Sequence, residues 1–185
     1  MPSLNLEHEV VSRAYFKLAE ALRWSGIHIN DGDHCTEIGA SPGGTCQLLL
    51  EKGAIVIAID PAELDKEIEK HPNLKYIRGR GKEVRKKDLK DTRWLFADLN
   101  VTPTYTLDSI EDIVSSQHLK KLRGMVLFLK ITDWKMAGNV PSWNQRVSKL
   151  GFQVVKTRQL AFNRNEICLV AVRDKFALRA SKKRS

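Results

Sequence analysis

Three charged residues stand at the ends of apolar segments, where an unpaired charge is costly to bury. Asp98 ends the run RWLFAD, Lys130 ends GMVLFLK, and Glu166 begins EICLVAV. An amine held near carboxylates can bind a substrate hydroxyl and take its proton. Each residue on its own fits an exposed strand end equally well, but the three together indicate a polar reactive site.

A glycine-rich loop, EIGASPGGT, lies between a segment with a strand pattern and a segment with a helix pattern. Gly39, Gly43 and Gly44 allow a tight turn and the close approach of a ligand. Pro42 fixes one turn, and the helix that begins near Gly44 offers backbone N–H groups. Asp60 ends the strand-like run AIVIAID, about twenty residues further on, which suits an acid that binds ribose hydroxyls.

Several ligands or activities compete for this loop. A P-loop needs Gly-Lys-Ser/Thr, but Thr45 follows Gly44, and the GxGxxG spacing of a dinucleotide site is missing. GASPG matches a nucleophile elbow at Ser41, but only His118 comes late enough to serve it, and it lies within an expected helix. A cationic nucleoside without phosphate, such as S-adenosylmethionine, needs neither phosphate motif. The glycines could also serve a tight turn alone.

The elements expected to position these residues alternate between strand and helix. Strands are predicted at 34–39, 54–60, 74–79, 93–99, 124–131 and, as a hairpin with a turn at 163–165, within 152–173. Helices are predicted at 11–26, 44–53, 62–71, 107–122 and 141–151. This alternation predicts an α/β fold with a mainly parallel sheet, a C-terminal antiparallel hairpin and helices on both faces. Lys17 falls on the polar side of the first helix, with Arg13 and Glu20.

Length and charge narrow the class of protein. The 185 residues predict a single domain over 1–175 and a flexible basic tail over 176–185. The net charge is +9, and residues 70–93 hold ten Lys/Arg against three acidic residues. This excess favours a nucleic acid partner, with Arg13 and the 70–93 stretch on phosphates.

The sequence also bears on the compartment. No apolar run approaches the ~20 residues that span a bilayer, and the N-terminus has no signal-peptide pattern. Cys35, Cys46 and Cys168 are scattered without a CxxC, which indicates buried thiols in a reducing compartment and no zinc site. We therefore predict a cytoplasmic protein without membrane contact.

The chain resembles the FtsJ/RrmJ-type RNA 2'-O-ribose methyltransferases over nearly its whole length. The matching segments, in the order of the family, are SRAYFKL, EIGASPGG, AIDPAELD, FADLNVTP, LFLKI and NRNEICLVAV. RQLAFNRNEI and LFLKITDWK look most like the catalytic domain of the RlmM-type enzymes, which methylate large-subunit ribosomal RNA. Their accessory THUMP domain is expected to be absent here, so a separate protein would be the source of additional RNA binding.

The resemblance implies a Rossmann-like fold and methyl transfer from S-adenosylmethionine to a ribose 2'-hydroxyl of RNA, ribosomal RNA in particular. The Lys-Asp-Lys-Glu tetrad of the family falls on Lys17, Asp98, Lys130 and Glu166. Lys130 would act as base at the hydroxyl, with Asp98 orienting it near the methyl group. No metal is expected, because a sulfonium is already an activated donor. The implied cofactor-binding residues are Glu37, Gly39, Ala40, Ser41, Pro42, Gly43, Gly44, Thr45, Asp60 and Asp98.

The chain departs from the family at three places. Glu37 stands where Asp is usual, and Thr45 where an aromatic residue is common. Near the expected adenine site, Arg80 and Lys82 replace an acidic residue, and Glu83 is the nearest acid. A non-catalytic RNA-binding protein on the same fold is therefore the alternative function.

Three tryptophans are candidates for stacking on RNA bases. Trp94, Trp134 and Trp143 each fit the hydrophobic core better than an RNA surface. The oligomeric state has no signature in the sequence.

Overall fold

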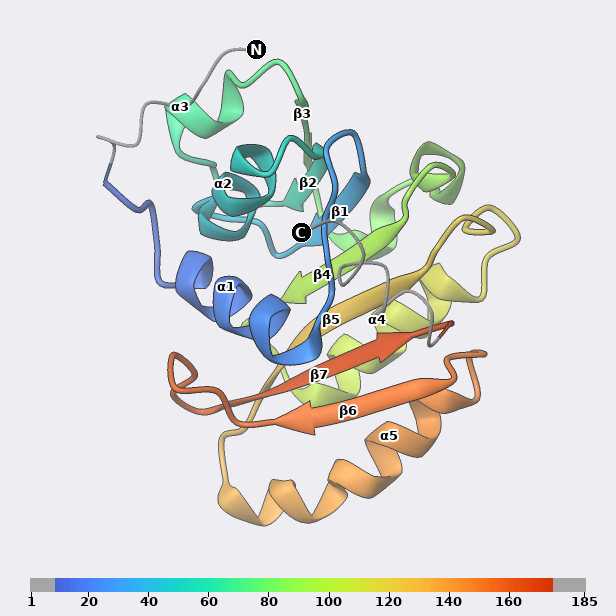
Figure 1. Cartoon of the computed structure of the whole chain (residues 1–185). Helices are drawn as coiled ribbons and strands as arrows, with labels where there is room; N and C mark the ends of the chain where they lie inside the picture. Colours follow the sequence, from blue (N-terminus) through green and yellow to red (C-terminus); the bar gives the residue numbers. More distant parts are fainter. Residues whose placement is uncertain (1–8, 175–185) are drawn as a thin grey trace, which may run out of the picture.

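Seven strands form one sheet in a computed structural model that describes residues 9–174. Their order in the sheet is β3-β2-β1-β4-β5-β7-β6 (Figure 1). The strands are β1 (His34–Ile38), β2 (Ile55–Asp60), β3 (Leu74–Arg78), β4 (Trp94–Asp98), β5 (Gly124–Lys130), β6 (Val154–Arg158) and β7 (Glu166–Val172). The first five pair in parallel, whereas β7 is antiparallel to both β5 and β6. The predicted parallel sheet with a C-terminal hairpin is confirmed; the expected tail, 176–185, lies outside the described residues.

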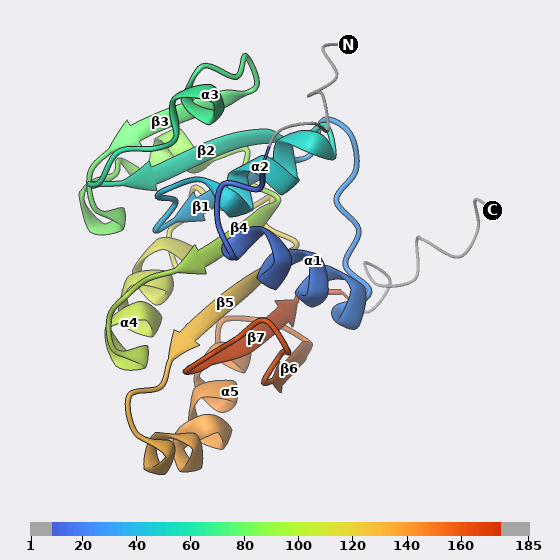
Figure 2. The ribbon, with the colours of Figure 1, turned by 90° about the vertical axis from the view of Figure 1, so that its left-hand side faces the viewer.

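Five α-helices and three short 3-10 helices connect the strands in the described part of the chain. The α-helices are α1 (Ala14–Ser25), α2 (Gly44–Glu51), α3 (Lys66–Glu69), α4 (Pro103–Val114) and α5 (Val140–Ser148). The 3-10 helices are η1 (Gly81–Glu83), η2 (Lys86–Leu89) and η3 (Trp134–Asn139). Helices α1 and α2 cover one face of the sheet, and α4 and α5 cover the other, as Figures 1 and 2 show. The prediction of helices on both faces is confirmed.

The two core layers follow from the alternation of side chains along each strand. In β4, Trp94 and Phe96 point into the core under α1 and α2, whereas Leu95 and Ala97 point into the core under α4 and α5. All four are at most 1% exposed. The sheet is thus buried on both sides, which explains why its strands appear as nearly continuous apolar runs in the sequence.

The chain order reverses between β1 and β4, which lie side by side in the sheet. The loops that leave the carboxyl ends of these two strands diverge toward opposite faces, and open α/β sheets bind their ligands at such points. The glycine-rich loop follows β1, and Asp98 is the last residue of β4. The topology therefore brings both sequence features to one edge of the sheet.

Three helices begin at other residues than predicted, because one tertiary contact and two local side-chain caps decide where they start. Residues before Ala14 run along α2, where the Val11 N–H donates to Gln47 Oε1 (3.0 Å). Helix α3 is shortened to four residues, because the Asp65 side chain caps it. Helix α4 begins earlier than predicted: the Thr102 hydroxyl accepts the Tyr105 N–H at the first turn. It ends at Val114, before the predicted end at residue 122.

The three cysteines are buried free thiols, as predicted. Among the helices of residues 9–174, none has the length and apolar character needed to cross a membrane. Of the tryptophans, Trp94 and Trp143 lie in the core, but Trp134 is 63% exposed at the start of η3.

Candidate active site

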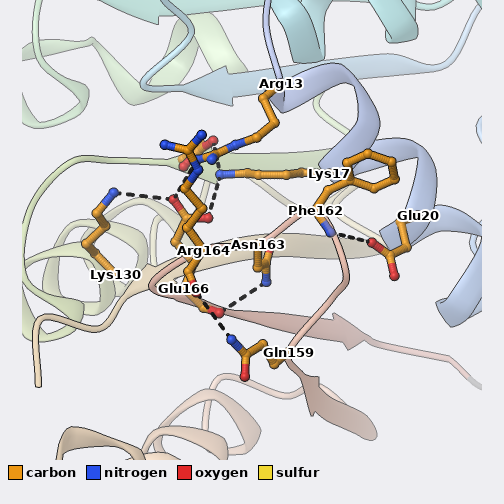
Figure 3. A network of polar contacts seen from close by, with 10 residues as sticks. Arg13, Lys17, Glu20, Lys130, Gln159, Phe162, Asn163, Arg164 and Glu166 are labelled. Carbon is orange, nitrogen blue, oxygen red and sulfur yellow. Dashed lines mark hydrogen bonds and ion pairs between the residues drawn. The ribbon is translucent and has the colours of Figure 1, made fainter. Parts of the chain in front are cut away.

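Four charged side chains meet at the carboxyl edge of the parallel strands, and Figure 3 labels three of them, Lys17, Lys130 and Glu166. Asp98 ends β4 and Lys130 ends β5. Because β7 is antiparallel, its first residue, Glu166, stands directly opposite Lys130 in the strand register. Lys17 reaches the same place from α1. The inserted antiparallel strand therefore explains how a residue from the end of the chain joins the site.

These side chains form an alternating chain of charges. Lys17 Nζ lies 2.6 Å from Asp98 Oδ2 and 3.1 Å from Glu166 Oε2. Lys130 Nζ lies 3.4 Å from Glu166 Oε1. The Lys17 side chain is 3% exposed and its amine also lies 4.5 Å from the centre of the Phe128 ring, whereas the Lys130 side chain is 33% exposed. Lys130 is thus the lysine of the group that a substrate can reach.

The two carboxylates respond to burial in different ways. Burial would raise the pKa of Glu166, but Lys17 and Lys130 together hold it below its usual range. Burial raises the pKa of Asp98 more than its ion pair with Lys17 lowers it. Glu166 is therefore the firmly ionised member, placed between the two lysines.

Two expectations about this group are corrected by the geometry. Lys17 is on the predicted side of α1, but the start of β7 covers this side, so Lys17 is buried rather than on a polar surface. Asp98 was expected to orient Lys130, but its ion pair is with Lys17, and the carboxylate paired with Lys130 is that of Glu166. The orienting contact for Lys130 therefore comes from β7.

At Gly39, the geometry of the site allows no residue other than glycine. Its φ of +82° is in the left-handed region, and a Cβ there would lie 2.5 Å from the backbone oxygen of Asp98. The N–H groups of Gly39 and Ala40 both donate to the Ile59 carbonyl. The loop after β1 is thus fastened to β2 and pressed against the end of β4.

The paired glycines of the loop serve packing. A Cβ on Gly44 would lie 2.2 Å from Ser12 Oγ, and a Cβ on Gly43 would lie 3.2 Å from a methyl group of Ile68. Thr45 is 1% exposed. Gly43 and Gly44 thus allow α2 to lie close to its neighbours, and none of these three predicted cofactor residues lines the cavity beside the tetrad.

Ser41 and Asp60 are joined to each other across the loop. The Ser41 N–H donates to Asp60 Oδ2 (3.0 Å), and Asp60 Oδ1 accepts the Ala62 N–H (2.8 Å). The Ser41 hydroxyl donates to the Glu63 carbonyl (2.7 Å). Because no histidine lines the cavity that contains Ser41, the geometry gives no support to a nucleophile elbow.

Glu37 is a buried acid at the floor of the site, 1% exposed. The Cys46 thiol donates to its Oε2 at 2.9 Å. Burial raises the pKa of Glu37 to about 8, although the side chains of Cys46 and Thr45 lower it. The carboxyl is therefore largely protonated at neutral pH and can donate as well as accept a hydrogen bond.

Two cavities open beside the loop and meet at Gly39 and Leu99, which line both. The charged chamber, about 380 Å³, contains the tetrad together with Glu37, Gly39, Ala40, Ser41 and Pro42. The apolar chamber, about 360 Å³, is lined by Ile38, Ile59, Leu99, Val101, Tyr105 and residues 79–82 among others. A ligand with a charged amino-acid part and a flat aromatic part fits this pair of chambers, and S-adenosylmethionine has both.

The comparison that decides the family covers most of the chain: residues 10–168 match the family described as FtsJ-like methyltransferase. The chain belongs to this family. The resemblance predicted from the sequence is confirmed, as is the Rossmann-like fold.

Curated relatives of this FtsJ-like chain are ribosomal RNA large subunit methyltransferases. The enzyme M of Aeromonas hydrophila is 28% identical over 119 residues, which are 60% of this chain and 32% of that protein. The enzyme M of Halorhodospira halophila is 34% identical over 82 residues (42% and 24%), and the enzyme E of Thermoplasma acidophilum is 44% identical over 54 residues (29% and 26%). The matches span less than a third of the length of each relative.

Solved structures share the fold at low identity. A candidate hemolysin of Lactococcus lactis superposes with a TM-score of 0.70 at 20% identity, covering 89% of both chains. A chain of the fibrillarin/Nop5p complex superposes with a TM-score of 0.63 at 13% identity, covering 85% of this chain and 81% of that one. These identities establish the fold alone.

The apolar chamber of the FtsJ-like chain shows where sequence reasoning was incomplete. Arg80 and Lys82 line it as expected, and Lys82 Nζ lies 4.4 Å from the centre of the Tyr105 ring. Glu83 does not line it; its carboxylate accepts the Arg80 N–H (2.9 Å). Tyr105 and Arg164 were missed. The position of Arg164, two residues before Glu166, was the available signal.

Proposed function

We propose that this chain transfers the methyl group of S-adenosylmethionine to a ribose 2'-hydroxyl of RNA, with ribosomal RNA as the substrate class. The observation that carries the proposal is the charge chain Asp98–Lys17–Glu166–Lys130, placed where the charged chamber opens. Membership of the FtsJ-like methyltransferase family supports the reaction class. The names of the curated relatives support ribosomal RNA.

The two chambers would hold the methyl donor. Glu37, Gly39, Ala40, Ser41 and Pro42 would surround its charged part. Its adenine would enter the apolar chamber, bounded by Tyr105 and residues 79–82. When bound, S-adenosylmethionine supplies a methyl group activated by its sulfonium charge. In this arrangement adenine is recognised mainly by the shape of the chamber, because Glu83 does not line it.

Asp60 would bind the ribose hydroxyls of the donor. Each of its carboxylate oxygens accepts one backbone N–H in the structure, which leaves further lone pairs for ribose hydroxyls. Gly43 and Gly44 would act through the position of α2, and Thr45 through its side chain, which lowers the pKa of Glu37.

Lys130 would bind the substrate hydroxyl. In its neutral form it takes the hydroxyl proton as the oxygen bonds to the methyl carbon, and the electron pair of the broken carbon–sulfur bond stays on sulfur. Glu166 stabilises the ammonium that results on Lys130. Lys17 holds Glu166 and Asp98 in place and keeps both carboxylates paired. Alignment of the three reacting atoms supplies several kcal/mol more.

RNA would approach from the side that carries exposed cations and Trp134. Arg13 and Arg164 line the charged chamber, and Trp134 follows Lys130 by four residues. The 70–93 stretch adds surface lysines and arginines, including Arg80 and Lys82 at the apolar chamber. Affinity for RNA should therefore fall steeply with salt concentration.

The deciding experiment is transfer of labelled methyl from S-adenosylmethionine to total RNA by the wild type and by Lys130→Ala. We expect label with the wild type and at least about a 100-fold slower transfer with the variant. The donor should raise the melting temperature of both proteins, because binding stabilises the folded state. Equal transfer by both proteins would refute the role of Lys130. RNA binding without transfer by the wild type would favour the non-catalytic alternative.

A further inference from the structure

Two exposed phenyl rings stack on each other beside the charged chamber. Phe16 lies on α1, and Phe162 lies in the loop between β6 and β7. Their centres are 5.2 Å apart with an interplanar angle of 20°, and the residues are 40% and 43% exposed. Such an exposed apolar surface is costly in water and often marks a contact with another molecule.

The loop that carries Phe162 is fastened by other contacts. Both carboxylate oxygens of Glu20 accept backbone N–H groups, from Ala161 (2.9 Å) and from Phe162 (3.1 Å), as Figure 3 shows for the second. Asn163 Nδ2 donates to the Glu166 carbonyl (3.2 Å). The two bonds to Glu20 already hold the loop on α1. The contact between the two rings is therefore not needed to keep the loop in place.

The same two elements bring cations to the mouth of the chamber. Arg13, the N-cap residue of α1, precedes Phe16 by three residues, and on the loop Arg164 follows Phe162 by two residues. The side chains of Arg13 and Arg164 converge above Glu166 in Figure 3, and both line the charged chamber. Within the described part of the chain, no carboxylate forms an ion pair with Arg164. Its guanidinium is thus available to an anion.

We propose that Phe16 and Phe162 form a platform on which an unpaired RNA base stacks, next to the nucleotide whose ribose is methylated. Arg13 and Arg164 would bind the phosphate that joins the two nucleotides. Aromatic faces with adjacent cations suit single-stranded RNA, because every base has a π-face and every linkage a negative charge. The inference rests on the proposed function and adds that the nucleotide beside the target is single-stranded.

The test is binding of a fluorescein-labelled single-stranded RNA of mixed sequence, about twelve nucleotides long, measured by fluorescence anisotropy. Phe162→Leu and Phe16→Leu keep apolar bulk but lose the π-face. Each should raise the Kd about tenfold, whereas Phe162→Tyr should stay within about twofold. Ile55→Ala, at an exposed apolar residue of β2, serves as the matched control. The donor-induced rise in melting temperature should be unchanged in all four variants.

An abasic version of the same RNA separates stacking from a structural role. The wild type and Phe162→Leu should bind the abasic RNA equally well. If Phe162→Leu lost the same affinity for both RNAs, or lost none for either, the platform would be refuted. The methyltransferase proposal would remain intact. Dissociation of a dimer by Phe162→Leu in gel filtration would instead make the rings a self-association surface. A wild type that binds no RNA would overturn the proposed function, and the platform with it.

Discussion

Glu166 and Lys130 are paired twice, once through the backbone and once through their side chains. They are opposite residues of the antiparallel strands β7 and β5, and Oε1 of Glu166 lies 3.4 Å from the amine of Lys130. The strand register thus sets the position of the amine. Lys130 is held by a neighbour whose own place is fixed by the sheet, so little reorganisation is needed before a substrate hydroxyl arrives.

Replacing Glu166 by Gln should therefore affect catalysis more than donor binding. The amide keeps the shape but removes the charge beside both Lys130 and Lys17. Methyl transfer should fall by about 100-fold or more, while the donor still raises the melting temperature. Single-turnover transfer assays measure the first effect and thermal denaturation the second. Glu166→Asp, which keeps the charge, should retain more activity than Glu166→Gln; the reverse order would contradict the electrostatic role.

Replacing Lys17 by Met should destabilise the fold in a pH-dependent way. The change leaves the buried Glu166 carboxylate and the partly buried Asp98 carboxylate without their shared cation, which costs about 3–5 kcal/mol when both are charged. Their pKa values would rise above those of the unfolded chain, so the loss should be larger at pH 8 than at pH 5. Urea unfolding at the two pH values measures it. Lys130→Met, at a more exposed lysine, should lower the free energy of unfolding by less. An equal loss would contradict the role of Lys17 as the buried cation shared by the two carboxylates.

Replacing Gly39 by Ala should close the site. The left-handed backbone costs about 1–2 kcal/mol for a residue with a Cβ, and that Cβ would lie 2.5 Å from the Asp98 carbonyl oxygen. We expect a lower melting temperature and loss of the donor-induced shift. Gly138→Ala is the matched control, because a Cβ there meets nothing within 4 Å. Normal donor binding by Gly39→Ala would show that the loop tolerates the displacement.

Glu37 should make stability fall as the pH rises. Its pKa is raised from 4.5 to about 8 by burial, so its contribution is complete below pH 4.5 and is lost between pH 4.5 and 8. The full shift corresponds to roughly 5 kcal/mol as an upper bound. Glu37→Gln cannot titrate and should show a flatter profile over this window in denaturant unfolding. Glu67→Gln, at an exposed carboxylate, should follow the wild type. Parallel profiles for Glu37→Gln and the wild type would refute the raised pKa.

The sequence predicted those parts of the site that depend on strand ends. Asp98, Lys130 and Glu166 were identifiable because a charge at the end of a buried run is conspicuous, and parallel topology brings such ends together. The burial of Lys17 was not predictable in the same way. It depends on β7 covering one side of α1, which is a contact between distant segments.

For the glycine loop, the sequence could not show what the glycines are there to accommodate. Its composition indicated a ligand site, but a glycine gives the same signal whether a ligand or a neighbouring element comes close. Only the coordinates show that Gly44 is required by Ser12 and Gly39 by Asp98. Likewise Trp134 was expected in the core, and its exposure follows from the position of η3 beyond the end of β5.

The insertion of β7 between β5 and β6 has a consequence for the growing polypeptide. All the side chains of the apolar chamber come from residues 38–109, whereas the charge chain is complete only once Glu166 has paired with β5. Contacts between distant segments, such as the bond from Ala161 to Glu20, form slowly relative to local ones. A nascent chain folded only as far as β5 would thus possess the apolar chamber, which we propose holds adenine, but not the complete charge chain. Reactivity is acquired last, when the final strand closes the gap in the sheet.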